Sequence, residues 1–201
     1  MRPSHVCEAL HHLVRIRQPV FLWGPPGVGK SRLVADVARR QGRKLYDLRA
    51  VLLDPVDLRG LPRISDDGIT SWCVPEFLPH PQDTEEGILF LDEINCVSET
   101  LSPAMLLFLQ YKVFGGHQIP EGWVVVTAGN PPRFNKSVRE FDAATRDRLK
   151  VIEVEPSYEA WKAYALEHGV SRSVISYLDI RPEDFYKVET TVDGLTVVTP
   201  R

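Results

Sequence analysis

The sequence predicts an α/β protein built on a parallel β-sheet of about five strands that is flanked by helices. Short apolar runs of strand type alternate along the chain with segments whose apolar residues recur at helical spacing. Such alternation is typical of parallel sheets, because their strands are joined by helical crossovers. A glycine-rich loop follows the first strand, and two acids end a later one. Both features favour the same architecture, since the carboxyl ends of parallel strands meet at one edge of the sheet.

The elements are expected in the following order. The predicted strands cover residues 19–23, 44–48, 88–91, 123–127 and 151–154. The predicted helices cover residues 4–17, 31–41, 100–110, 157–167 and 171–178. Ser4 is a suitable N-cap for the first helix, and Gly42 a suitable end for the second. After Glu155 the pattern changes to helices without an intervening strand, so we expect a boundary there, between residues 1–155 and residues 156–201.

The loop "GPPGVGKS" lies between the first predicted strand and a predicted helix, and it matches the phosphate-binding pattern G-x-x-x-x-G-K-S. Glycines let backbone N–H groups approach phosphate oxygens, and the helix N-terminus adds partial positive charge. We expect Lys30 to reach the β- and γ-phosphates and Ser31 to bind Mg²⁺. The alternative is a turn with an incidental lysine. The expected nucleotide-binding residues are Gly24, Pro25, Pro26, Gly27, Val28, Gly29, Lys30, Ser31 and Arg32.

Two later strands place polar side chains at the same sheet edge. The apolar run 88–91 ends in Asp92 and Glu93, and the run 123–127 is followed by Asn130. We expect Asp92 to bind Mg²⁺ and Glu93 to polarise a water molecule for attack on the γ-phosphate. Asn130 is expected to orient that water, although asparagine is also a common turn residue.

The nucleotide is expected to be ATP rather than GTP. Residues 57–60, "DLRG", match the D-x-x-G switch of GTPases by letter. GTPases of that type also carry an N-K-x-D motif that reads guanine, and residues 135–138, "NKSV", lack its acid. The predicted cofactors are therefore ATP and Mg²⁺.

Composition and charge limit the function further. The 201 residues carry a formal net charge of -3 and 43% hydrophobic residues, which is ordinary for a globular core. That charge gives no general attraction for nucleic acid or anionic lipid, and no apolar run reaches the length of a membrane span. Cys7, Cys73 and Cys96 lack metal-ligand spacing. We therefore expect free thiols and a cytoplasmic protein without a membrane span.

The motifs, taken in order, resemble those of AAA+ ATPases and specifically of the MoxR family. The matching segments are "GPPGVGKS", "GILFLDEIN", "VVVTAGNPP", "ATRDRL" and the terminal "TPR". The resemblance implies an AAA+ core in residues 1–155 and a partial helical lid in residues 156–201. It also implies that Arg148, with Arg146 as the alternative, reaches the ATP of a neighbouring subunit. Leu149 departs from the family's usual phenylalanine, which leaves the choice between these arginines open.

The same resemblance assigns roles to the lid and to two inserts. Arg201 matches the sensor 2 arginine, which touches the γ-phosphate of its own subunit. Because the sequence stops at this arginine, we expect either a fragment of a longer chain or an abbreviated lid. Hairpins are predicted around residues 66–68 and 115–116. They resemble substrate-contact inserts of the MoxR branch. The candidate contact residues are Arg63, Trp72, Phe114 and His117, although Trp72 and Phe114 could instead pack their hairpins onto the body.

Three functions are compatible with these residues. The first is an ATP-hydrolysing ring, a hexamer by resemblance, that remodels a protein partner such as a von Willebrand A domain protein. The second is a nucleotide-dependent assembly scaffold with little hydrolysis. The third is a nucleic-acid motor of related ring type, for which the acidic inserts are unfavourable.

Overall fold

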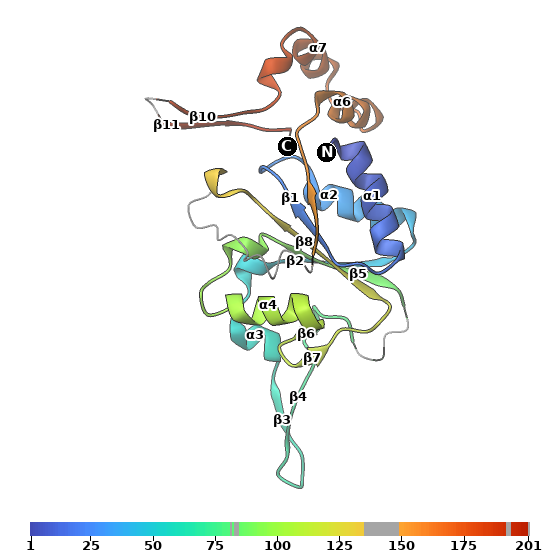
Figure 1. Cartoon of the computed structure of the whole chain (residues 1–201), viewed down its shortest axis with the longest axis vertical. Coiled ribbons are helices and arrows are strands. Elements are labelled where there is room, and N and C mark those ends of the chain that lie inside the picture. Colours follow the sequence, from blue (N-terminus) through green and yellow to red (C-terminus); the bar gives the residue numbers. More distant parts are fainter. Residues whose placement is uncertain (81, 83–84, 135–148, 192–193, 201) are drawn as a thin grey trace.

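A five-stranded parallel sheet forms the centre of the protein in the computed structural model, which describes residues 1–80, 82, 85–134, 149–191 and 194–200 (Figure 1). The strand order is β2-β5-β8-β1-β9, and every neighbouring pair is parallel. The strands are β1 (Val20–Trp23), β2 (Lys44–Arg49), β5 (Gly87–Asp92), β8 (Trp123–Gly129) and β9 (Lys150–Glu153). The predicted fold class is thereby confirmed.

Helices cover both faces of this sheet, because its central strands are apolar on both sides. All six residues of β5 are buried, and their side chains alternate between the two faces. Ile88 and Phe90 pack with α1 (Pro3–Arg15) and α2 (Lys30–Arg40). Leu89 and Leu91 pack on the other face with α3 and α4. These helices cover residues Pro55–Arg59 and Ser102–Tyr111.

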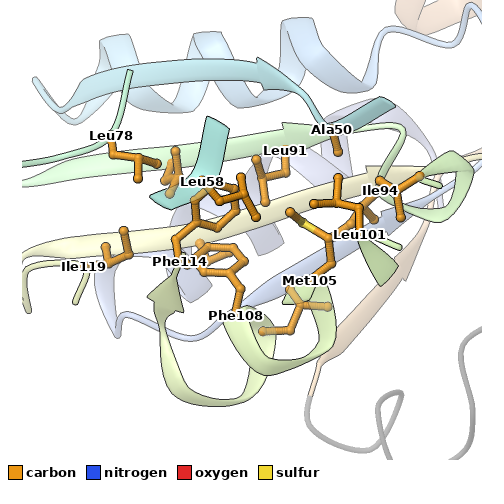
Figure 2. Packing of buried hydrophobic residues seen from close by; sticks show 14 of the residues in the cluster. Ala50, Leu58, Leu78, Leu91, Ile94, Leu101, Met105, Phe108, Phe114 and Ile119 are labelled. Atoms are coloured by element: carbon orange, nitrogen blue, oxygen red, sulfur yellow. The ribbon is translucent and has the colours of Figure 1, made fainter. Parts of the chain in front are cut away.

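The hydrophobic cluster between α4 and the sheet shows how the inserts are attached to the body. Phe108 of α4 and Phe114 are fully buried, and their rings meet edge to face with centroids 4.7 Å apart. Leu58 of α3 packs into the same cluster beside them (Figure 2). Because each of these side chains comes from a different element, the cluster joins α3, α4 and the hairpin that follows α4.

The two predicted hairpins are present, and they differ in how they are placed. The first, β3 (Pro62–Ile64) with β4 (Thr70–Trp72), extends away from the body, and all six strand residues are exposed (Figure 1). The second consists of β6 (Val113–Phe114) and β7 (His117–Gln118). It packs close to α3, because a Cβ on Gly115 would lie 1.9 Å from the carbonyl oxygen of Leu58. Phe114 therefore packs its hairpin onto the body, whereas Trp72 is 46% exposed.

The segment after β9 contains two helices and an unexpected hairpin. Helix α6 (Tyr158–Glu167) is capped by Ser157, whose Oγ accepts a hydrogen bond from the backbone N–H of Ala160, and α7 (Arg172–Ile180) follows. The two predicted helices are confirmed, but the hairpin after them was not predicted: β10 (Lys187–Thr191) and β11 (Gly194–Val198) form an antiparallel pair. The sequence "VETTVDGLTVV" carried the signal, since D-G between β-branched runs is typical of hairpins.

Element boundaries also differ in detail from the predictions. The first helix has Arg2 rather than Ser4 at its N-cap. Pro3 stands at the first helical position, where its fixed φ is compatible with a helix and its missing N–H costs nothing. Strands β2, β5 and β8 extend one or two residues further than predicted, to Arg49, Asp92 and Gly129. The described part of the chain also contains four short 3-10 turns: Ala50–Leu52, Ile94–Cys96, Pro132–Phe134 and Pro182–Asp184.

Candidate nucleotide-binding site

The loop between β1 and α2 is a tight backbone turn that depends on its glycines. Gly27 and Gly29 have φ angles of 78° and 89°, in the left-handed region that favours glycine. Gly24 packs against the backbone just after β9. A Cβ on Gly24 would lie 2.5 Å from the carbonyl oxygen of Val154. The loop ends at Lys30, the first residue of α2. Its backbone N–H groups thus stand beside a helix N-terminus, where anions are favoured.

Lys30 lies at the centre of the site. It is only 7% exposed. Its Nζ donates to the carbonyl oxygens of Gly24 (2.8 Å) and Pro25 (3.0 Å) and to Oδ1 of Asn130 (2.7 Å). A buried ammonium needs oxygen partners of this kind, since burial of an unpaired charge is costly. The lysine is thus held against the loop by groups that phosphate oxygens could replace.

Ser31 and Asp92 form the second contact. The Ser31 Oγ donates to Oδ2 of Asp92 over 3.0 Å, although 61 residues separate the two in sequence. A serine hydroxyl next to a carboxylate is a donor set that suits Mg²⁺, which uses few protein oxygens and completes its shell with water and phosphate. Among the described residues, no group of three or more His, Cys, Asp and Glu side chains could hold a metal by itself. Ser31 and Asp92 therefore fit a metal that arrives with a nucleotide.

Glu93 occupies the position where β5 leaves the sheet. Its φ is 58°, so the chain turns through the left-handed region directly after Asp92. The backbone N–H of Glu93 donates to Oδ1 of Asp92 (2.9 Å), which orients the aspartate. The Glu93 side chain is 35% exposed, and water can therefore reach its carboxylate.

Arg49, at the end of β2, was not predicted to belong to this site. Its Nη1 lies 3.5 Å from Oε1 of Glu93 and 4.0 Å from Oδ2 of Asp92. Desolvation and the Asp92 charge raise the pKa of the Asp47 carboxyl, two residues earlier, whereas Arg49 lowers it. The available signal was positional, since a charged residue that ends a strand of this sheet reaches the same edge as Asp92.

Asn95 was also missed as a site residue. It lies in the turn after Glu93 and is 3% exposed. Its Nδ2 donates to the carbonyl oxygen of Asn130 (2.8 Å), and its Oδ1 accepts from the Asn130 N–H (3.4 Å). Its presence in "DEIN" was visible, but sequence spacing could not reveal which backbone it contacts.

Arg32 points to the C-terminal segment rather than into the loop. Its guanidinium lies over the Tyr164 ring (5.5 Å to the centroid), donates to Nε2 of His168 (3.1 Å) and pairs with Asp36 (3.3 Å). These contacts join α2 to α6 beside the phosphate-binding loop. The expectation that Arg32 contacts nucleotide remains a prediction.

The chain end also approaches the loop. A Cβ on Gly27 would lie 2.5 Å from the Cβ of Thr199. The indole N–H of Trp161, on α6, donates to the carbonyl oxygen of Pro200 (3.1 Å). Arg201, Arg146 and Arg148 lie outside the described residues, so their predicted roles stay predictions.

Together, these elements bring Lys30, Ser31, Asp92, Glu93 and Asn130 to one edge of the sheet. A glycine-rich loop before a helix, with an acidic strand end two strands away in the sheet, defines a P-loop nucleotide-binding protein. Residues 19–149 match the family described as the AAA domain, dynein-related subfamily. The match covers well over half of the chain, and the protein belongs to this family. By class it is an ATPase domain.

Several known proteins are similar to this chain in sequence or fold over part of their length. An uncharacterized AAA domain-containing protein of Mycobacterium tuberculosis is 28% identical over 94 residues, which are 47% of this chain and 18% of that protein. A Cytophaga hutchinsonii protein, provisionally described as an ATPase, has the same fold (TM-score 0.55, 16% identity), with 98% of this chain covering 55% of that structure. NtrX from Brucella abortus, solved with ADP, matches over 84% of this chain and 41% of its own (TM-score 0.51, 15% identity). The chain thus spans about half or less of these relatives.

Within the described residues, no helix is long and apolar enough to cross a bilayer. Cys7, Cys73 and Cys96 form no disulfide with one another.

Proposed function

We propose that this domain binds ATP with Mg²⁺ at the loop of residues 24–31 and hydrolyses it. The observation that carries the proposal is the position of Lys30. Its buried ammonium contacts two loop carbonyls and Asn130, one residue before the Ser31–Asp92 contact. A cation held in this way beside a helix N-terminus is suited to the β- and γ-phosphates of a nucleotide.

Each residue would have a separate role in hydrolysis. Lys30 would exchange its carbonyl partners for phosphate oxygens. Ser31 and Asp92 would hold Mg²⁺, which neutralises phosphate charge when bound. Glu93, whose carboxylate water can reach, would accept a proton from the attacking water. Asn130 would hold that water in line.

The test compares nucleotide binding with phosphate release. Lys30→Ala should abolish ATP binding, because the phosphates lose their main cationic partner. Glu93→Gln should still bind ATP and lose turnover, since only proton acceptance is removed. Normal hydrolysis by the Glu93→Gln variant would contradict the assignment of the base, and normal binding by Lys30→Ala would contradict the site itself.

The proposal extends to a ring of identical subunits that remodels a protein partner, as in the MoxR branch. Support comes from the motif order and from the β3–β4 hairpin, which extends away from the body (Figure 1). Ile64 and Trp72 of this hairpin are exposed. A von Willebrand A domain protein is the partner class that this resemblance suggests. A Trp72→Ser variant should lose partner-stimulated hydrolysis and keep basal hydrolysis. Loss of basal activity instead would argue against a contact role.

Two alternatives are separated by the same assays. An assembly scaffold would form ATP-dependent oligomers with phosphate release no faster than in Glu93→Gln. A nucleic-acid motor would show hydrolysis that DNA stimulates in a salt-dependent way. The exposed acids Asp54, Asp57, Asp66 and Asp67 in the first insert disfavour the motor, because they repel phosphates.

A further inference from the structure

The side chain of Asn95 hydrogen-bonds to the backbone of Asn130, at a position where β8 no longer pairs with β5. Paired residues of β5 and β8 end at Leu91 and Thr127, because β5 turns away after Asp92. The amide of Asn95 then meets the backbone of Asn130 with one donor and one acceptor, over 2.8 and 3.4 Å. A side-chain amide has the same donor and acceptor as a peptide group. Asn95 thereby continues the pairing of β8 where its neighbour strand has left.

This contact determines where Asn130 stands relative to Lys30. The Asn130 backbone is held on one side by Asn95, and its Oδ1 accepts from the Lys30 ammonium over 2.7 Å. If phosphate oxygens engage Lys30, the Asn130 side chain loses this partner while its backbone stays fixed by Asn95. We propose that Asn95 is a positioning residue for ATP hydrolysis, which sets Asn130 to orient the attacking water. The proposal rests on the proposed hydrolysis.

A second observation supports a close fit at this point. A Cβ on Gly129, the last residue of β8, would lie 2.5 Å from Oδ1 of Asn95. Its backbone is not among the positive-φ glycines of the described residues, so conformation alone does not require glycine there. Glycine is required at this position because the Asn95 side chain occupies the space that a Cβ would need. Gly129→Ala should therefore displace Asn95 from the opposite side.

If the Asn95 hydrogen bonds served only stability, the variants would behave differently. Loss of buried hydrogen bonds lowers stability wherever they lie, so reduced stability alone would say nothing about position. A positioning role predicts that turnover falls while nucleotide affinity is kept, since Asn130 acts only on the water. A fall in kcat without a matching change in the Kd for ATP therefore distinguishes a positioning role from a purely structural one.

The experiment uses the full chain with two variants and one control. Asn95→Leu keeps the shape of the side chain and removes both hydrogen bonds, and Gly129→Ala displaces the intact amide. Thr127→Val removes another buried side-chain bond of β8, from Oγ1 to the carbonyl oxygen of Val20 (3.3 Å), away from the site. Phosphate release at saturating ATP, the Kd of a fluorescent ATP analogue and the unfolding midpoint are measured for each. Both variants should lose turnover about tenfold or more, with a Kd changed less than about threefold, and Thr127→Val should keep turnover.

The outcomes are distinct. Full turnover in folded Asn95→Leu or Gly129→Ala, beside an active wild type, would overturn this inference alone. If turnover falls only in proportion to ATP affinity, Asn95 has a structural role alone, and the proposed positioning role is overturned as well. Wild-type phosphate release no faster than in Glu93→Gln would overturn the proposed hydrolysis and, with it, this inference. If Asn95→Leu does not fold, Gly129→Ala decides.

Discussion

The guanidinium of Arg49 stands beside the carboxylates of Asp92 and Glu93, with Nη1 at 4.0 Å from Oδ2 of the first and 3.5 Å from Oε1 of the second. The parallel register of β2 and β5 places Arg49 directly opposite Asp92. A fixed cation therefore occupies the neighbourhood that we assign to Mg²⁺. A Mg²⁺ ion bound at Asp92 would be repelled by the Arg49 guanidinium, because both cations would lie beside the same aspartate.

Removing this cation should favour metal binding. In Arg49→Gln, the Mg²⁺ concentration for half-maximal phosphate release should fall about threefold, and the difference should shrink at high salt because the arginine is half exposed. Arg15→Gln, an exposed arginine on α1, is the matched control and should change nothing. A raised Mg²⁺ requirement in Arg49→Gln would mean that Arg49 supports the metal site.

Gly27 and Thr199 should be coupled in stability. Alanine at Gly27 or Gly29 costs about 1–2 kcal/mol, because both positions have positive φ. Only Gly27 meets Thr199, whereas nothing lies within 4 Å of a Cβ on Gly29. Gly27→Ala should therefore lower the free energy of unfolding more than Gly29→Ala does. Thr199→Gly should recover part of that loss in the Gly27→Ala background, and strictly additive effects in denaturant unfolding would exclude the contact.

Asp179 should make the contact between α6 and α7 sensitive to acid. A hydrogen bond from Lys162 (2.5 Å) and one from the Tyr158 hydroxyl (2.7 Å) lower the pKa of the Asp179 carboxyl below 3.8. Because this pKa is lower in the folded state, its stabilising contribution is complete above 3.8 and is lost as pH falls through the folded pKa. Asp179→Asn should thus lower the unfolding temperature at pH 7 and not below that pKa. An equal difference at both pH values would point to a neutral packing effect.

The aromatic contact between Phe108 of α4 and Phe114 of β6 should be a major source of stability. Phe108→Ala removes a fully buried ring that packs edge to face on Phe114, and it should cost about 3–5 kcal/mol of unfolding free energy. Leu107→Ala, at the preceding position of the same helix and 54% exposed, should cost about 1 kcal/mol or less. Chemical denaturation measures both, and similar losses would contradict the observed burial.

The arginine assignment is tested by mixing two inactive variants. If Arg148 reaches the neighbouring subunit, Arg148→Ala should bind ATP and lose turnover about 10³-fold, as for other arginine fingers. Mixed with Glu93→Gln, it should regain some activity, because one interface then combines an intact Glu93 with an intact Arg148. Mixed assemblies that form and stay inactive would exclude a role in trans. The same mixing with Arg146→Ala identifies which arginine acts.

Much of the fold followed from local patterns. Continuous apolar runs such as residues 88–91 can be satisfied only when both faces of a strand are covered, so they indicated buried parallel strands. Because such strands end at one edge, Lys30, Asp92 and Asn130 could be assigned to one site before their contacts were known. The hairpin of β10 and β11 was missed despite its D-G turn signal, because the neighbouring segments favoured helices.

The remaining features depended on distances across the sheet. Asn95 contacts Asn130 only because the chain turns at Glu93 and β8 lies beside β5, and neither condition is encoded in local spacing. Arg49 reaches Glu93 through the register of β2, and Thr199 reaches Gly27 across 172 residues of chain. Residue type and spacing therefore determined the phosphate-binding loop and the acidic strand end, since their chemistry is local. Tertiary packing alone decided which polar groups hold them, because side-chain partners far apart in sequence are selected by strand order and register.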